Sequence, residues 1–336
     1  MRRAIIPLFI GLALAACGDS DEEAEVRPEG NDRPAQAANL AMQHDLLALS
    51  HLADIDHHGL YVDFGGPARA KYTVGNWGSG WGSDGADGDI RYTHVDDTGR
   101  IYFPVDEPGA LTLRFQMKPV GSRRMQLFLN GSSLEGVVLE EGDQFRHYDV
   151  SVPAEHVRRG DNYLLLRFGG TTPVDGEDVA VARASLRVIP GAPAEGERFA
   201  PPQWDTLVSA VELGGVERQA LAFRAPTTLS YHLEVPESGQ LVFGVGAEGT
   251  GENLMARIRV TPEGGEANEI FHARPEGRWN DQALSLSSYA GQVVRLDLEV
   301  SGSGNGRVAF SGAGVMVPPP DAADAPEPAR NDVVLL

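Results

Sequence analysis

The residues best suited to chemistry lie in one glycine-rich stretch. Asp84, Asp87 and Asp89 are separated there by glycine and alanine, and carboxylate oxygens are the hard ligands that Ca²⁺ prefers. Trp77 and Trp81 precede them, and their flat apolar faces suit stacking on a sugar ring or another ligand. These five residues are the candidate calcium and ligand sites. Because the spacing does not match an EF-hand, a simpler interpretation stays open: a solvated loop whose tryptophans close the hydrophobic core.

A second polar cluster precedes the first predicted β-rich region. It contains His44, His51, Asp54, Asp56, His57 and His58. A zinc site needs three or four convergent ligands with supporting hydrogen bonds, and nothing in this spacing makes the side chains converge. We interpret the cluster as the polar end of a helix.

Catalytic motifs are absent from the sequence. The glycine–serine stretches do not form the Gly-x-Ser-x-Gly nucleophile elbow that many Ser–His–Asp hydrolases use. Aspartate and glutamate total 48, but they lie mostly in predicted turns and linkers, so no glycosidase-like carboxylate pair stands out. We therefore predict that this chain is not an enzyme by itself.

The first seventeen residues predict export and lipid attachment. Arg2 and Arg3 precede an apolar stretch that is too short to span a bilayer, as in the h-region of a signal peptide. This stretch ends in Leu-Ala-Ala-Cys at Cys17, which resembles the lipobox of bacterial lipoproteins. We expect lipid on Cys17 to anchor the protein to a bilayer of the cell envelope, and Gly18 favours the outer membrane. The alternative is an ordinary secretory signal with an incidental cysteine.

Composition narrows the classes of partner. The formal net charge is −20, and an acidic chain repels phosphate backbones, so we expect no nucleic-acid binding. Cys17 is the only cysteine, which excludes an intrachain disulfide. The length of 336 residues suffices for two domains of ordinary size.

Hydrophobic alternation predicts a mainly β protein after residue 57. The strands expected in a first domain are 100–105, 110–117, 125–129, 137–139, 145–152, 163–168 and 179–188. Those expected in a second domain are 219–224, 229–235, 240–245, 255–260, 267–272, 281–286, 293–300 and 307–315. Asn130-Gly131 predicts a hairpin turn with positive φ at both residues. Short strands with frequent turns favour two antiparallel β-sandwich domains in tandem, with loops as the place for recognition.

The full organisation follows from these patterns. We expect a signal peptide with lipobox at 1–17, a disordered acidic tether at 18–36, a short N-terminal helix at 37–57, β-sandwich domain 1 at 58–190, a linker at 191–202, β-sandwich domain 2 at 203–317, and a proline-rich linker with the start of another domain at 318–336. The helix rests on leucines at helical spacing, and we expect it to pack against the first domain.

Three segments resemble the jelly-roll domains called galactose-binding-like. The hairpin 127–131 is similar to that family's x-V-x-L-N-G, and the strand 160–168 is similar to its G-x-N-x-L-x-L. Residues 286–296 resemble a late segment of the same fold. The resemblance covers about residues 60–317 and implies a fold that binds or positions, without naming a ligand.

The last residues carry a shorter resemblance. Residues 330–336 are similar to the R-P-N-V-V-L-I strand that opens sulfatase catalytic domains, although Asp332 departs from that pattern. The resemblance implies a non-catalytic accessory region in front of a sulfatase-type hydrolase. The sulfatase motif C/S-x-P-x-R is absent, so this chain alone is not expected to hydrolyse sulfate esters. The alternative is a free-standing lipoprotein that binds a carbohydrate or a cell surface.

Overall fold

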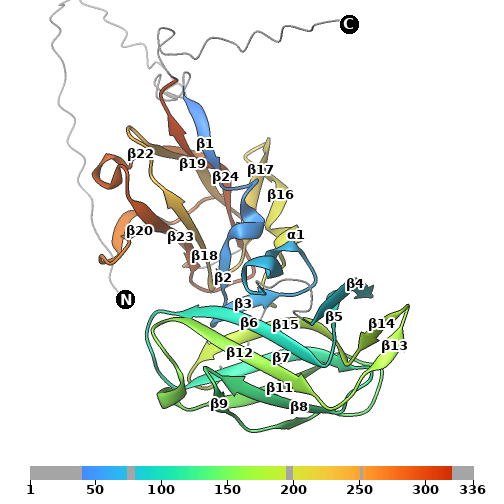
Figure 1. Ribbon diagram of the computed structural model, residues 1–336. Coiled ribbons are helices and arrows are strands. Elements are labelled where there is room, and N and C mark those ends of the chain that lie inside the picture. Colours follow the sequence, from blue (N-terminus) through green and yellow to red (C-terminus); the bar gives the residue numbers. More distant parts are fainter. Residues whose placement is uncertain (1–39, 74–79, 194–199, 250–252, 320–336) are drawn as a thin grey trace, which may run out of the picture. The chain divides into compact units, whose positions relative to one another are not determined.

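The computed structural model describes residues 40–73, 80–193, 200–249 and 253–319. All of them belong to one unit of the chain, residues 36–336. The prediction of a mainly β protein with two antiparallel sandwiches in tandem is confirmed (Figure 1). The predicted signal peptide, lipobox, acidic tether and sulfatase-like segment lie outside the described residues.

The first sandwich packs two sheets face to face. One sheet contains β6 (Thr98–Val105), β8 (Arg124–Leu129), β9 (Ser132–Ser133), β10 (Val137–Val138) and β12 (Gly160–Phe168). The facing strands are β3 (Leu60–Asp63), β4 (Trp81–Asp87), β5 (Ile90–Val95), β7 (Leu111–Pro119), β11 (Arg146–Val152) and β15 (Val181–Pro190). A separate hairpin pairs β13 (Thr172–Val174) with β14 (Glu177–Val179).

The second sandwich repeats this arrangement. One sheet contains β1 (Ala41–Asp45), β16 (Val208–Leu213), β17 (Val216–Phe223), β19 (Gln240–Glu248), β22 (Asn280–Ser285) and β24 (Arg307–Val317). The facing strands are β2 (Asp54–Asp56), β18 (Thr227–Glu234), β20 (Met255–Pro262), β21 (Asn268–Ala273) and β23 (Val293–Ser301).

Helical segments are short. They are η2 (Ser50–Leu52), η3 (Pro67–Lys71), η4 (Ala154–His156), α1 (Trp204–Leu207) and η5 (Ser287–Tyr289). Within the described ranges, none of them has the length and apolar character that a membrane span requires.

One sheet runs through both sandwiches. Its strand order is β11-β7-β15-β3-β2-β18-β23-β20-β21, so the short strands β2 and β3 connect the two halves by hydrogen bonds. The turn between them contains Gly59 at a φ of +116°, and a Cβ there would come within 2.3 Å of the Val188 carbonyl oxygen. Only glycine fits this turn. The turn connects β2, a strand of the second sandwich, to β3, a strand of the first.

The two cores follow the alternation read from the sequence. In β7, Leu113, Phe115 and Met117 are fully buried, whereas Arg114 and Gln116 between them are partly exposed. The predicted turn is also confirmed, because Asn130 and Gly131 have φ values of +51° and +89°. The apolar faces of the two sheets therefore pack against each other and form the core of each sandwich.

The helix expected over residues 37–57 is wrong. Its described part forms β1, η2 and β2, and β1 pairs antiparallel with β24. Leu46 and Ile55 lie in the core of the second sandwich, not against the first. Pairing with β24 and burial in this core outweigh the helical spacing of the leucines.

A local interaction also opposes that helix. The carboxylate of Asp45 accepts hydrogen bonds from the backbone N–H groups of Leu47 at 2.9 Å and Ala48 at 3.1 Å. Such side-chain turns compete with helix formation, so the chain turns directly after β1.

Candidate functional site

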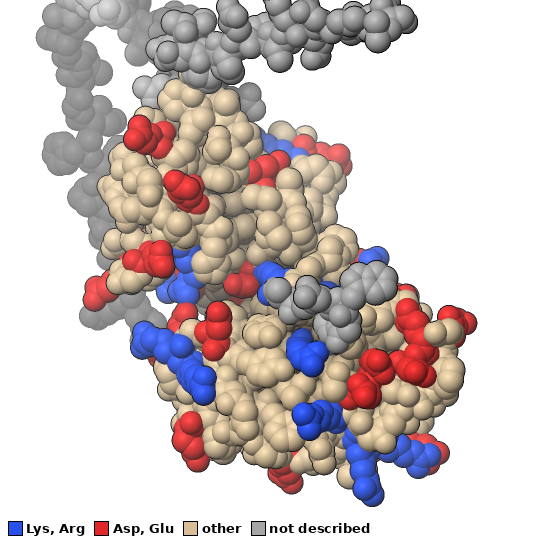
Figure 2. Space-filling model, viewed as in Figure 1, with Lys and Arg blue, Asp and Glu red and all other residues tan. Residues whose placement is uncertain are grey.

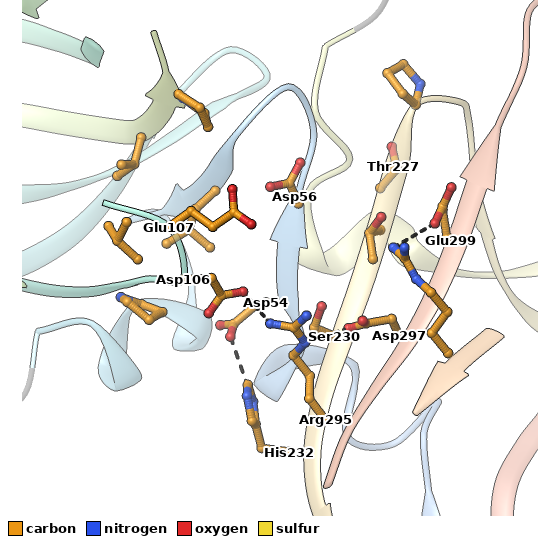
Figure 3. Close-up of a pocket in the computed structure, with 18 of the residues that line it drawn as sticks. Asp54, Asp56, Asp106, Glu107, Thr227, Ser230, His232, Arg295, Asp297 and Glu299 are labelled. Carbon is orange, nitrogen blue, oxygen red and sulfur yellow. Dashed lines mark hydrogen bonds and ion pairs between the residues drawn. The ribbon is translucent and has the colours of Figure 1, made fainter. Parts of the chain in front are cut away.

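A cleft lies where the outer face of the shared sheet meets the connection between β6 and β7 (Figure 3). Its floor is formed by outward side chains of β2, β18, β23 and β20, and one wall is formed by Pro104, Val105, Asp106 and Glu107. The cavity volume is about 730 Å³. This volume falls within the range of roughly 300–1,000 Å³ that is typical of small-ligand sites.

Strand alternation determines which side chains line the cleft. In β18, Leu229 and Tyr231 are buried in the core, so Ser230 and His232 face the opposite side. The strands β23 and β2 present charged residues in the same way. Because side chains alternate along each strand, one face of this sheet is apolar and the opposite face, toward the cleft, is polar.

The strand register aligns these polar residues into rows across the sheet. The first row, in the order β2, β18, β23, β20, is Asp54, Ser230, Asp297 and Arg259. The second row, in the same order, is Asp56, Thr228, Glu299 and Arg257. Directly opposite residues on neighbouring strands lie close enough to share one ligand, so the rows form a ladder of acceptors and donors.

Arg295 connects the floor to the wall of the cleft. Its Nη1 donates to Asp106 Oδ2 at 2.5 Å, and its Nε lies 3.2 Å from Oδ1 of Asp297. Burial acts to lower the pKa of Arg295, but the hydrogen bond that it donates to Asp106 and the charge of Asp297 raise this pKa overall. Arg295 therefore stays cationic and holds the wall against the floor. Acidic and basic side chains also gather in Figure 2 at the level where the two sandwiches join.

Glu299 bridges two arginines on β20. Its carboxylate lies 2.8 Å from Nη2 of Arg259 and 3.3 Å from Nη1 of Arg257. The three side chains are partly buried, so this network orients the carboxylate more firmly than a single exposed pair would.

Asp54 anchors the opposite end of the cleft. Its Oδ1 accepts from Lys71 Nζ at 2.6 Å and from the Tyr72 hydroxyl at 2.5 Å. Its Oδ2 lies 3.9 Å from Nδ1 of His232. Burial lowers the pKa of Lys71, with Asp54 opposing that effect, and burial followed by the Asp54 charge raises the pKa of Tyr72.

A second hollow of about 460 Å³ adjoins the cleft and shares Asp54 and Pro104 with it. Tyr102 lines this hollow with 37% of its surface exposed. Its ring lies 5.1 Å, centre to centre, from the ring of Tyr163 on the neighbouring strand. The cleft thus has an accessible aromatic surface beside its polar floor.

The predicted ligand residues Trp77 and Trp81 have no part in this cleft. Trp77 lies outside the described residues. The ring of Trp81 stacks on Phe64 at 4.9 Å with an interplanar angle of 11°, and its Nε1 donates to the Arg100 carbonyl at 3.3 Å. Trp81 packs against the core of the first sandwich, as the simpler interpretation of the glycine-rich stretch has it.

The three aspartates of the candidate calcium site have separate environments. Asp84 forms an ion pair with Arg69, and Asp87 lies 2.9 Å from Lys118 Nζ. Asp89 lines a different hollow. Across 40–73, 80–193, 200–249 and 253–319, no three His, Cys, Asp or Glu side chains are grouped in a way that could hold a metal ion.

The histidine-rich cluster contributes to the cleft only through its aspartates. Asp54 and Asp56 lie on β2 in the cleft floor. His57 is buried and its Nδ1 lies 3.0 Å from the Thr227 hydroxyl, whereas His44 Nε2 hydrogen-bonds the Glu234 carbonyl. These side chains do not converge.

Most cleft residues were not singled out from the sequence. Ser230, Arg295 and Asp297 stand at outward positions of predicted strands, so the alternation marks them as facing away from the core. Nothing in the alternation shows that β2 joins this face or that residues 104–107 cover it. Those contacts depend on tertiary pairing.

Comparisons with known proteins leave the family open. No family model matches the chain, and its sequence matches no curated protein. The solved structures found include the tandem CBM51 modules of a family 98 glycoside hydrolase from Streptococcus pneumoniae, with a TM-score of 0.26 and 11% identity over 68% of this chain and 84% of that one. The CBM22 tandem of a Paenibacillus barcinonensis protein has a TM-score of 0.25 and 12% identity over 79% and 97% of the two chains.

A third structure combines a catalytic domain with carbohydrate-binding modules. It is the M60 catalytic domain of a Clostridium perfringens protein with two CBM51 domains, at a TM-score of 0.25 and 8% identity over 71% of this chain and 37% of that one. At these scores the likeness carries no argument about ligand or activity. The sulfatase resemblance of residues 330–336 finds no support among these comparisons.

Proposed function

We propose that this chain is a non-catalytic glycan-binding protein of the cell envelope, anchored by lipid on Cys17, and that the glycan binds in the cleft. The observation that carries the proposal is the polar ladder of the cleft floor beside the exposed Tyr102, which contacts the partly buried Tyr163.

The polar ladder suits the hydroxyl groups of a sugar. Carboxylates such as Asp56 and Glu299 accept hydrogen bonds, and Arg259 donates them, in fixed positions along neighbouring strands. Charge-assisted hydrogen bonds of this type are short and directional, so a rigid set of them distinguishes the positions of hydroxyl groups. The ion pairs that orient these side chains reduce the entropy lost on binding.

The aromatic pair suits the apolar face of a pyranose ring. Tyr102 presents part of its ring to solvent beside the cleft, and its neighbour Tyr163 supports it across the strand pair. Aromatic side chains offer a large apolar surface with a polar end, which fits a ligand with one face of C–H groups and an edge of hydroxyls.

A glycan array probed with the full chain tests the binding proposal. The chain carries Cys17→Ser so that it can be purified without lipid. We expect retention on a defined set of glycans and about tenfold weaker binding for Tyr102→Ala, equivalent to ~1.4 kcal/mol. Tyr92→Ala, a change on β5 away from the cleft, is the matched control and should bind as the parent does. Absence of binding to every glycan, or equal loss in both variants, would contradict the proposal.

Anchoring is tested separately. Cells grown with a palmitate analogue should incorporate label into the full chain, and the chain should fractionate with membranes. Cys17→Ser should abolish both because the thiol is the attachment point. Membrane retention of the unlabelled Cys17→Ser chain would argue against a lipid anchor.

A further inference from the structure

Carboxylates outnumber cationic side chains in the cleft. Six carboxylates line it: Asp54, Asp56, Asp106, Glu107, Asp297 and Glu299. Two guanidinium groups do so, those of Arg259 and Arg295. Lys71 and Arg257 pair with lining carboxylates from the edges of the cleft, so carboxylates exceed these four cations by two. A recessed site with one dominant sign of charge concentrates ligands of the opposite sign.

Ion pairs compensate only part of this charge. Asp54, Asp106, Asp297 and Glu299 each contact a lysine or an arginine. In the described ranges no ion pair reaches Asp56 or Glu107, and Asp56 accepts only the backbone N–H of Gly59 at 3.2 Å. These two carboxylates face each other from the floor and the wall of the cleft (Figure 3).

Asp297 gives independent evidence for a hydrogen-bond-donating ligand. Its side chain is 3% exposed and lines the cleft in the first row, between Ser230 and Arg259. Its Oδ1 and the nearby Arg295 Nε lie 3.2 Å apart without hydrogen-bond geometry, and no described residue hydrogen-bonds to either atom. A buried carboxylate oxygen that has an ion pair but no hydrogen bond is only partly compensated, so a donor supplied by a ligand would stabilise it.

From these observations we infer that the cleft selects glycans with free, positively charged amino groups over neutral or N-acetylated glycans. An ammonium group supplies three donors and one positive charge, which matches Asp297 together with Asp56 and Glu107. The ring hydroxyls would then use the serine, threonine and arginine groups of the same face. This inference rests on the proposed glycan-binding function and names its ligand class.

Calorimetric titration of the full Cys17→Ser chain tests the inference with three probes: a β-1,4-linked glucosamine hexasaccharide, its fully N-acetylated counterpart, and spermidine. At pH 5.5 and low salt, we expect the glucosamine oligomer to bind at least about tenfold more tightly than the acetylated one. The difference should shrink when salt is raised to about 0.5 M, because ions screen the charges.

Variants distinguish the cleft from general surface acidity. Asp56→Asn and Glu107→Gln remove a charge from exposed side chains, and each should weaken binding of the glucosamine oligomer several-fold more than it weakens binding of the acetylated oligomer. Asp297→Asn should do the same more strongly, with its fold checked by circular dichroism. Asp175→Asn, at the tip of the β13–β14 hairpin, is the matched control and should have no effect.

The outcomes separate the two proposals. Equal binding of both oligomers would overturn the charge preference and leave glycan binding intact. Binding of neither oligomer, with a blank glycan array, would overturn both. Spermidine binding as tightly as the glucosamine oligomer would overturn the assignment to a glycan, since charge alone would then account for affinity.

Discussion

The guanidinium group of Arg183 lies 4.7 Å from the ring centre of Phe115, inside the core of the first sandwich. The ring centre of Phe64 lies 4.8 Å from the same group. Among the described residues, none of the three guanidinium nitrogens has a hydrogen-bond partner. Burial lowers the pKa of Arg183 to about 9, so the group is still charged at neutral pH. Within the described part of the chain, cation–π contacts are therefore the interactions that compensate this charge.

Replacing this charge should stabilise the protein. Arg183→Met keeps most of the volume and removes the desolvated charge, so we expect the free energy of unfolding to rise by about 1–3 kcal/mol. Urea denaturation at pH 7 measures it. The control is Arg114→Met, which breaks the partly exposed ion pair with Asp149 and should cost less than about 1 kcal/mol. A loss above about 2 kcal/mol for Arg183→Met would show that the cation is stabilising where it lies.

Asp63 should make the free energy of unfolding decrease as pH rises. Burial raises its pKa from 3.8 to about 6, and the nearby charge of Asp205 adds to this effect. The folded protein therefore holds a proton between pH 4 and 6 that the unfolded chain has released. This contribution is complete below pH 3.8 and is lost as pH rises through 6, with a total on the order of 3 kcal/mol.

Comparison of variants isolates the Asp63 effect. Asp63→Asn retains the oxygen that accepts from the Gly65 N–H but cannot titrate, so its unfolding free energy should lack this decrease between pH 4 and 7. Glu135→Gln changes an exposed carboxylate and should follow the parent curve. Parallel curves for the parent and Asp63→Asn would contradict the buried, protonated state.

Leu46 tests the corrected position of the N-terminal segment. It is fully buried in the core of the second sandwich, whereas Leu52 of the same segment is 51% exposed. Leu46→Ala should lower the free energy of unfolding by about 2–5 kcal/mol through lost burial and a cavity. Leu52→Ala should cost less than about 1 kcal/mol. Equal losses in urea denaturation would mean that this segment does not pack as the structure shows.

Asn130 fixes the hairpin after β8 through its amide. Its Nδ2 donates to the His156 carbonyl and to Asn162 Oδ1, both at 2.8 Å, and its Oδ1 accepts from the Tyr163 N–H at 3.0 Å. Asn130→Asp tolerates the same backbone but loses both donors and places a charge against two acceptors. Thermal denaturation should show a loss of about 1–3 kcal/mol at neutral pH, part of which returns at pH 3 when the carboxyl is protonated. An unchanged melting temperature would refute this role.

The sequence predicts many of the strands that have one buried face, although β5 and β16 were not among the predicted strands. The strands β6, β7 and β8 and the Asn130-Gly131 turn were predicted because alternation and turn chemistry are local. The segment before residue 57 was misassigned because its leucines have helical spacing. Its conformation is instead determined by pairing with β24, which lies far along the chain.

The candidate site was less accessible to prediction for the same reason. Trp81 and Asp84 drew attention by residue type, yet one packs against the core and the other pairs with Arg69. The cleft instead uses outward positions of ordinary strands, together with β2 and residues 104–107. Recognition on a sheet face between two sandwiches requires knowing which strands are neighbours, and local sequence does not contain that information.

Carboxylate footprinting of the full Cys17→Ser chain tests the central claim most directly. Carbodiimide labelling of aspartate and glutamate is read by mass spectrometry, with and without the glycan that binds most tightly on the array. The account predicts that this glycan lowers labelling of Asp56 and Glu107 in the cleft and leaves Asp143 and Asp175, outside it, unchanged. Unchanged labelling of Asp56 and Glu107 at saturating glycan would contradict it, because the ligand would then bind elsewhere.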